Sequence, residues 1–459
     1  MIVGNIFKNK EDVVQGKKLK IANGIKEIGK EAFIGLKGLT GDLIIPEGVT
    51  LIGVAAFHSC TGLNGNLTIP SSVRTIGASA FGGLEGLTGD LIIPEGVTLI
   101  GQAAFYSCTG FNGKLSIPSS VKEIGDAAFL GLKGLTGDLI IPEGVTLIGH
   151  QAFYRCTGLN GDLTIPRSVE TIGNAVFSEC SGFAGTLTIG MENIPETNSL
   201  FFGCKFSRLV IENSVKTIKD EYAFSDMNFS RGIEIQNGIT TIGGHVFCGV
   251  KTTGDLVIPD SVTSVGEDAF TSLTITGNLV IPSSITTVGN EAFSSIKSTG
   301  ENGTLKIGLA NIPAETVFAT FNNLILDDTV REVGERAFEG SSFGNITISE
   351  GIEEIADKAF SSARFTGDLI IPSSVQTIGE QAFVGCGFGG RITINEGVKN
   401  IKGSAFAGCN FTGELRIPKS VTTIGFGAFS DCSSLTKVIV ENKSADIASG
   451  AFPSGITIE

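Results

Sequence analysis

The chain has 459 residues, among them 63 glycines and 31 phenylalanines but no tryptophan, and its formal net charge is −14. An acidic chain repels phosphate backbones, so this charge argues against binding to nucleic acid. The apolar runs extend over only a few residues, far short of the roughly 20 that span a bilayer, so we expect no transmembrane segment.

Residues 1–18 precede the first copy of a repeat that fills the rest of the chain. A repeat array needs a terminal cover for the apolar core of its outermost unit, so we predict that these residues form an N-terminal cap. They contain neither the sustained apolar segment nor the small-residue cleavage site of a secretory signal peptide. The start of the sequence therefore leaves a cytoplasmic location open.

The repeat occupies residues 19–459, and residues 67–81 show its full frame, Leu-x-Ile-Pro-x-x-Val-x-x-Ile-Gly-x-x-Ala-Phe. Successive copies of the final Phe lie 24 residues apart from Phe33 to Phe201, and mostly 23 apart from Phe224 onwards. Each apolar side chain therefore meets the same neighbours in every copy, which is typical of a solenoid. We count about 19 units, including one centred on Phe318.

Each unit is expected to contribute a short strand at Leu-x-Ile, because these residues alternate and favour extended structure. The Pro that follows has no N–H to donate and ends the strand at a fixed point. Val-x-x-Ile-Gly predicts a second short extended piece, whereas the spacing in Gly-x-x-Ala-Phe-x-x-Cys predicts a single helical turn. Parallel strands stacked about 4.8 Å apart then give a repeat solenoid that is mainly β.

Two units depart from this frame, near residues 186–202 and 304–321. Both contain Asn-Ile-Pro and lack the Val-x-x-Ile-Gly segment that fills the second face in the other units. We therefore predict a local change in curvature or twist at both units.

The extended frame, which continues after the Phe as x-x-Cys-x-x-Leu, resembles the BspA-like leucine-rich repeat over about residues 19–459. The resemblance implies a right-handed superhelix with a parallel sheet on one face. Members of that family are mostly surface or secreted proteins of bacteria and parasitic protists, and several are linked to adhesion to host cells or extracellular-matrix proteins. This sequence lacks the asparagine ladder of the general leucine-rich repeat and carries Ser72 where an Asn would stand.

Residues that could support catalysis or bind metal are few and scattered. His58, His150 and His245 are the only histidines, and they occupy different positions of the frame, so they cannot stack into one site. Eight of the nine cysteines lie three residues after a repeat Phe, which predicts a buried core column, although disulfide pairing along that column stays open. Aspartates that follow a Gly form another column, which we interpret as a solvated turn in preference to a calcium site: Asp42, Asp90, Asp138 and Asp162.

Two columns of outward-facing residues are the candidate partner-binding sites. The middle residue of Leu-x-Ile points away from the core, and an outward row of apolar residues there is typical of a contact site. This column contains Ile44, Thr68, Ile92, Ser116, Ile140 and Thr164. A second column, one residue after the Phe in every second unit, contains His58, Tyr106 and Tyr154. Strand propensity together with recent duplication of a 48-residue pair of units would also explain both columns.

The sequence therefore predicts a monomeric, non-enzymatic scaffold without a cofactor, whose partner is a protein that lies along the outer sheet of residues 40–170. The family resemblance implies an adhesin-like role, a host-surface or matrix protein as the partner, and the cell surface or the secreted fraction as the location. The alternative is a structural or self-assembling surface protein. An enzyme is disfavoured, because no cluster of His, Asp, Glu and Cys stands outside the repeat frame.

Overall fold

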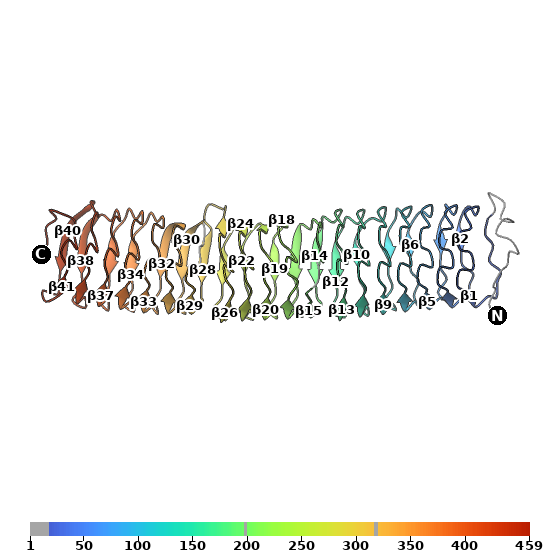
Figure 1. Cartoon of the computed structure of the whole chain (residues 1–459), viewed down its shortest axis with the longest axis horizontal. Coiled ribbons are helices and arrows are strands. Elements are labelled where there is room, and N and C mark those ends of the chain that lie inside the picture. The colour runs from blue at the N-terminus through green and yellow to red at the C-terminus, as the bar shows by residue number, and fades with distance from the viewer. Residues whose placement is uncertain (1–17, 197–199, 316–319) are drawn as a thin grey trace. The chain divides into compact units, whose positions relative to one another are not determined.

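The computed structural model describes residues 18–196, 200–315 and 320–459. The chain divides into two compact units, Met1–Phe229 and Ser230–Glu459. Each unit is a parallel β-solenoid, as the sequence predicted (Figure 1). The described residues form about 18 turns. Except for Lys18, the predicted N-terminal cap lies outside the described residues, and so does Phe318, the centre of one unit counted in the sequence.

In the N-terminal unit, each regular coil contains a strand at Leu-x-Ile and a strand that ends at the Ile of Ile-Gly. We call these the Leu strands and the Ile-Gly strands. The Leu strands are β2 (Leu43–Ile44), β4 (Leu67–Thr68), β6 (Leu91–Ile92), β8 (Leu115–Ser116), β10 (Leu139–Ile140), β12 (Leu163–Ile165), β14 (Thr186–Ile189) and β16 (Arg208–Ile211). The Ile-Gly strands are β1 (Glu27–Ile28), β3 (Leu51–Ile52), β5 (Thr75–Ile76), β7 (Leu99–Ile100), β9 (Glu123–Ile124), β11 (Leu147–Ile148), β13 (Thr171–Ile172), β15 (Asn193–Ile194) and β17 (Thr217–Ile218). A further short strand is β18 (Asn228–Phe229).

The C-terminal unit repeats this arrangement and adds short strands after some of the Phe positions. Its Leu strands are β19 (Ile233–Ile235), β22 (Leu256–Val257), β25 (Leu279–Ile281), β28 (Thr304–Ile307), β30 (Thr320–Leu326), β32 (Ser342–Ile348), β34 (Leu369–Ile371), β36 (Ile392–Ile394), β38 (Gly413–Ile417) and β40 (Leu435–Val440). Its Ile-Gly strands are β20 (Thr241–Ile242), β23 (Ser264–Val265), β26 (Thr287–Val288), β29 (Asn311–Ile312), β31 (Glu332–Val333), β33 (Glu354–Ile355), β35 (Thr377–Ile378), β37 (Asn400–Ile401), β39 (Thr423–Ile424) and β41 (Asp446–Ile447). The added strands are β21 (Lys251–Thr252), β24 (Thr274–Ile275) and β27 (Lys297–Ser298).

Where strands of successive coils pair in the described residues, they pair in parallel and keep the frame, except for one register shift between β38 and β40 at Gly413 and Glu414. Ile140 of β10 lies opposite Thr164 of β12, and Ile148 of β11 lies opposite Ile172 of β13. Because side chains alternate along a strand, this register places every frame position above its equivalent in the next coil.

The turn segment, as we call the stretch from the Gly of Ile-Gly to the third residue after the Phe, does not form the predicted helical turn, and that prediction was wrong. No helix is present in residues 18–196, 200–315 or 320–459. Ala56 donates its N–H to the Gly53 carbonyl three residues back at 3.2 Å, whereas Phe57 donates to the Ala80 carbonyl of the next coil at 2.8 Å. Ala55 adopts a φ of 51°, and non-glycine residues with positive φ recur at this frame position. Since alternate N–H groups point to the neighbouring coil, the bonds of an α-helix cannot form.

The repeat Phe side chains form a stacked spine in the core of each unit. Neighbouring ring centroids from Phe33 to Phe224 lie 5.1 to 5.8 Å apart. In the C-terminal unit the stacked pairs from Phe247 to Phe293 and from Phe338 to Phe452 lie 5.0 to 5.7 Å apart. Each coil therefore buries its aromatic ring mainly against the coils on either side.

The cysteine column lies in the same core and is made of free thiols. Cys60 donates its S–H to the carbonyl of Phe33 in the preceding coil at 2.8 Å, and Cys108 makes the same bond to Phe81 at 3.0 Å. Burial raises the pKa of Cys60 to about 11 and that of Cys108 to about 12. The thiols of Cys60 and Cys108 are therefore protonated core groups at neutral pH. Cys248 is the one cysteine that is only half-buried.

The two irregular units shorten the connection between their strands. Asn193 in β15 lies four residues after Ile189 in β14. In a regular coil, Thr171 lies six residues after Ile165. Met191 fills the core within this shorter connection and is 1% exposed. In the described parts of the chain, no strand pairing joins β13 to β15 or β26 to β29. The ladder of Ile-Gly strands is thus interrupted at both units, and the change in curvature or twist stays a prediction.

Replacing Phe177 by Ala should lower the free energy of unfolding by about 3–5 kcal/mol, because the ring leaves a cavity between neighbours that cannot close. Phe177 is fully buried and lies 5.6 and 5.8 Å from the rings of Phe153 and Phe201. Urea denaturation followed by circular dichroism measures the change. Phe426→Ala is the matched control, since Phe426 is 69% exposed. Equal stability of the two variants would contradict a packed spine.

The native protein should react with Ellman's reagent at no more than one thiol at neutral pH, and at all nine after unfolding in guanidinium chloride. Because burial raises the pKa of Cys60 and Cys108 above the ordinary value near 9, the folded state holds these protons more tightly than the unfolded state. Their contribution to stability should be complete below pH 9 and should be lost as the pH rises towards 11–12. Rapid labelling of several thiols in the native protein would contradict this placement.

Candidate functional site

The first predicted column lies on the outer face of the Leu strands. Ile44, Ile92 and Ile140 are 56%, 56% and 63% exposed. Thr68 and Ser116 are also exposed, whereas Thr164 is half-buried. The register places Ile44 opposite Thr68, Ile92 opposite Ser116 and Ile140 opposite Thr164. The structure therefore gathers these six residues on one side of the N-terminal unit.

The Leu strands of the column pair two by two up to β8 and form one continuous sheet from β10 to β16. Pairing joins β2 to β4, β6 to β8, and β10 onwards to β16, whereas none is present between β4 and β6 or between β8 and β10 in this part of the structure. Each 48-residue pair of coils presents one exposed Ile beside one Thr or Ser, so the apolar side chains recur at every second coil. This period equals the 48-residue duplication found in the sequence.

Aspartate side chains link neighbouring coils of the N-terminal unit at the start of the Leu strands. The Asp42 carboxylate accepts the N–H of Asn66 at 2.8 Å, and in the return direction Asn64 accepts the N–H of Gly41 at 2.8 Å. Gly65 is required at this point, because a Cβ there would collide with the Asp42 carboxylate. Equivalent carboxylate bonds lie at 2.6 to 2.9 Å and involve Asp90, Asp138 and Asp162. The aspartate column is thus used for backbone bonding at the entry to the Leu strands.

The second predicted column lies on the turn segments, on a different side of the coil from the Leu strands. Tyr106 is 43% exposed, and His58 and Tyr154 are half-buried. The guanidinium of Arg155 lies 5.0 Å from the centre of the Tyr154 ring, which is cation–π geometry. The structure does not bring the two columns together, so they form two separate candidate surfaces.

Sequence reasoning missed Phe202, which continues the second column. It follows Phe201 directly, lies 48 residues after Tyr154 and is 63% exposed. It belongs to an irregular unit, so a search by the regular frame passes over it. The constant interval of 48 residues was the signal that could have identified it.

The other histidines lie apart from both columns. His150 is exposed, and its Nδ1 accepts the N–H of Asn174 at 2.9 Å. In the C-terminal unit, Nε2 of His245 lies 3.5 Å from a carboxylate oxygen of Asp268. Among the described residues, no group of three or more His, Cys, Asp or Glu side chains is placed to hold a metal ion.

Two open clefts lie along the Leu strands of the C-terminal unit. One has a volume of about 570 Å³ and includes Val257, Val280 and the ion pair between Lys306 and Asp327, whose atoms lie 2.7 Å apart. The hydrogen bond from Lys306 lowers the pKa of the Asp327 carboxyl. The second cleft, of about 630 Å³, is lined in part by Thr393 and Arg416 of β36 and β38. The outer face of the Leu strands thus provides concave sites in the C-terminal unit.

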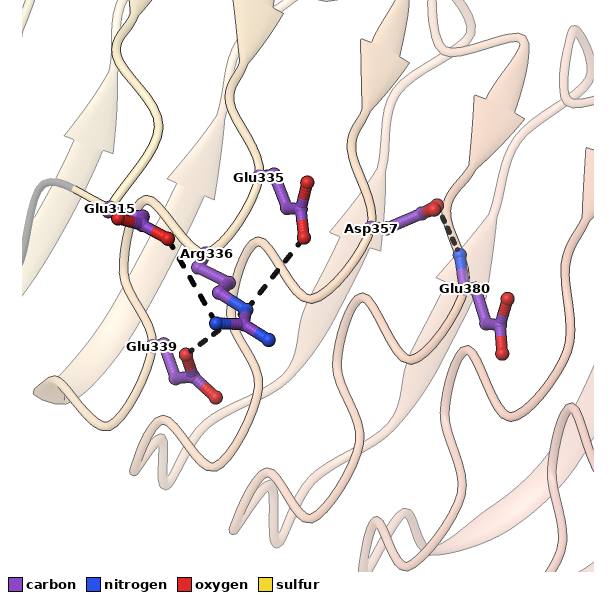
Figure 2. A network of polar contacts seen from close by, with 6 residues as sticks. All are labelled: Glu315, Glu335, Arg336, Glu339, Asp357 and Glu380. Atoms are coloured by element: carbon purple, nitrogen blue, oxygen red, sulfur yellow. Dashed lines mark hydrogen bonds and ion pairs between the residues drawn. The ribbon is translucent and has the colours of Figure 1, made fainter.

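The turn segments of the C-terminal unit present a charged network instead (Figure 2). Figure 2 shows Arg336 surrounded by Glu315, Glu335 and Glu339, whose carboxylate oxygens lie 3.8 to 4.0 Å from its guanidinium nitrogens. These groups are well exposed, so each pair contributes at most about 1 kcal/mol. The network differs in chemistry from the aromatic column on the turn segments of the N-terminal unit.

Within the described parts of the chain, no helix has the length and the apolar character needed to cross a lipid bilayer. A search of curated proteins found no match. Among solved structures, the chain is similar to a leucine-rich repeat protein from Bacteroides ovatus, with 23% identity, coverage of 91% of each chain and a TM-score of 0.46. It is also similar to a leucine rich cell surface protein from Faecalibacterium prausnitzii, with 20% identity, coverage of 92% of this chain and 86% of the other, and a TM-score of 0.28.

The family comparison matches nearly the whole chain. The model described as a BspA type leucine rich repeat region matches residues 2–136, 64–184, 192–319, 311–436 and 353–459. These overlapping matches confirm the resemblance drawn from the repeat frame. The repeated strands, the stacked Phe spine and this match together show that the chain belongs to the BspA-type leucine-rich repeat family.

Proposed function

We propose that the protein is a non-enzymatic scaffold that binds a partner protein along the outer face of its Leu strands. The observation that carries this proposal is the row of Ile44, Ile92 and Ile140, each more than half exposed on a sheet. Exposed apolar residues in a repeated row lower the free energy when a partner covers them, since their contact with water is lost. The clefts on the Leu strands of the C-terminal unit support the same side for binding.

The chemistry of the core supports a scaffold over an enzyme. The buried thiols of Cys60 and Cys108 have raised pKa values and are therefore poor nucleophiles. The Asp42 carboxylate is bonded to the backbone, and the histidines lie in different columns. Cysteine, aspartate and histidine side chains, which often act in catalysis, thus form structural hydrogen bonds here or lie apart from one another.

The proposed partner is a host-surface or extracellular-matrix protein, and the proposed location is the cell surface or the secreted fraction. Membership of the BspA-type leucine-rich repeat family supports both proposals. The proposed state in solution is a monomer, because a face covered by a second copy would not be available to a different protein. Light scattering across a range of concentrations tests this point, and a mass that grows with concentration would favour the self-assembling alternative.

Charge substitution at Ile92 and Ile140, as Ile92→Lys with Ile140→Lys, should abolish capture of a protein partner from host-cell and matrix extracts. A lysine ammonium placed in the contact would be removed from water without a partner, which opposes binding. Capture is measured by pull-down followed by mass spectrometry, and circular dichroism should stay unchanged because both side chains point outward.

Val54→Lys is the matched control, since Val54 is an exposed apolar residue on the turn segments. The control should capture the partner as the unchanged protein does. Capture that survives the double substitution would exclude the outer face of the Leu strands as the binding site.

A further inference from the structure

The exposed aliphatic residues of the Leu strands share an acidic environment. Among the described residues, five aliphatic side chains on these strands are more than half exposed: Ile44, Ile92, Ile140, Val257 and Ile370. An Asp lies two residues before each of them, and a Glu or Asp lies three residues after all but Ile370. The outward residues of the intervening coils of the N-terminal unit lack this pair of carboxylates: Thr68, Ser116 and Thr164. Apolar exposure and negative charge therefore occur together.

The two carboxylates border each exposed residue at both ends of its strand. In the first copy, Asp42 directly precedes β2, and Glu47 follows the Pro that ends the strand. Asp42, Ile44 and Glu47 are all exposed. The same arrangement recurs after 48 and 96 residues, with Asp90 and Glu95 around Ile92 and with Asp138 and Glu143 around Ile140.

The glutamates of the N-terminal unit are not used for the architecture, although the same frame position is used in the C-terminal unit. There, Glu350 accepts the N–H groups of Ser373 and Ser374 in the next coil at 3.2 and 2.9 Å. Glu396 makes equivalent bonds to its next coil. In the part of the chain that the structure describes, no hydrogen bond or ion pair involves Glu47, Glu95 or Glu143. Their charges are therefore available to a partner.

Negative charge predominates around the row. In the six coils from residue 42 to residue 167, the positions two before and three after the outward residue carry seven carboxylates and two cations, Lys114 and Arg167. Arg74 lies near the glycine that follows Glu95, but its guanidinium donates to the carbonyls of Ser71 and Val73. Two further cations lie near the equivalent glycines, Lys26 and Lys122. Even with all of these cations counted, the carboxylates remain in excess.

The C-terminal unit repeats the combination beside a cleft. Asp255 and Asp260 occupy the two flanking positions of Val257, and both Val257 and Asp260 line the cleft of about 570 Å³. Lys306 is the cation among the lining residues, and Asp327 neutralises it at 2.7 Å. The cleft therefore combines exposed apolar surface with an excess of negative charge.

We infer that the outer face of the Leu strands binds a basic amphipathic segment of the partner protein, in which apolar side chains lie beside Lys or Arg. The apolar side chains of this segment cover the exposed aliphatic residues, and its cations meet the bordering carboxylates. Lys and Arg suit such a border, because their aliphatic stems pack on apolar surface while their charges stay at its rim.

Charge complementarity selects this partner over others. A neutral segment would remove carboxylates from water without supplying an opposite charge, and an acidic segment would be repelled. A second copy of this chain carries a formal net charge of −14, so it is repelled as well. The inference rests on the proposed function, because it specifies the chemistry of the partner that the same face binds.

The test uses two fluorescein-labelled peptides and fluorescence anisotropy. The lysine peptide consists of three Lys-Leu-Lys triplets, and the serine peptide has Ser in place of every Lys. The lysine peptide should bind saturably, and the serine peptide should bind at least about tenfold more weakly. Raising the NaCl concentration from about 50 to about 500 mM should weaken binding of the lysine peptide, because salt screens exposed charges.

Combining Glu47→Gln, Glu95→Gln and Glu143→Gln should weaken binding of the lysine peptide about tenfold, because three charges are removed and the side-chain shape is kept. The matched control replaces three exposed glutamates on or beside the Ile-Gly strands by Gln: Glu27, Glu123 and Glu170. The control changes the net charge equally and should bind as the unchanged protein does. Ile92→Thr with Ile140→Thr should also weaken binding about fivefold or more, and circular dichroism checks the fold of each variant.

Equal binding of the two peptides, no saturable binding of the lysine peptide, or equal affinity of the two glutamine variants would each overturn the inference. The proposed function is decided separately by the capture assay with Ile92→Lys and Ile140→Lys. Loss of capture in that assay, together with equal binding of the two peptides, would leave the face as the binding site and assign it to a partner of different chemistry.

Discussion

The backbone hydrogen bonds between the turn segments of successive coils are the constraint on which the rest of each unit depends. Phe57 donates to Ala80 and Phe81 donates to Ala104, both at 2.8 Å, and the pattern continues from coil to coil. These bonds need alternate N–H groups to point along the stack, which forces residues such as Ala55 into positive φ. They replace a helix by a flat turn, bring each Phe ring above the next, and hold both sets of strands in register.

The same constraint separates the residues that maintain the fold from those that are free to vary. Groups that are reactive in other proteins form structural hydrogen bonds here. The Cys60 thiol donates to the Phe33 carbonyl, and the Asp42 carboxylate accepts the N–H of Asn66. Side chains at outward positions do not maintain the fold, because they contact neither the Phe spine nor the paired strands. Any binding function of the scaffold therefore depends on which side chains occupy the outward positions and on how far apart they lie along the stack of coils.

Duplication of coils in pairs gives the N-terminal unit two surfaces with the same period and different chemistry. On the Leu strands, exposed Ile residues alternate with Thr or Ser, whereas on the turn segments rings alternate with smaller residues. The C-terminal unit has a shorter repeat, and its turn segments carry the charged network around Arg336 in place of rings (Figure 2). One architecture thus displays apolar, aromatic and charged rows without a change in its core.

The sequence alone determined the repeat, its parallel strands, the Phe spine and the family, because each follows from apolar residues at a fixed interval. It also placed Ile44, Ile92 and Ile140 on the outer face, since the side chains of a strand alternate. Only the tertiary structure decided the conformation of the turn segment. The spacing of Ala and Phe there fits a helix, but hydrogen bonds to the next coil prevent one from forming. It also decided the pairing of coils by Asp42 and the exposure of Phe202. These features depend on contacts between residues more than 20 positions apart, which a local pattern does not encode.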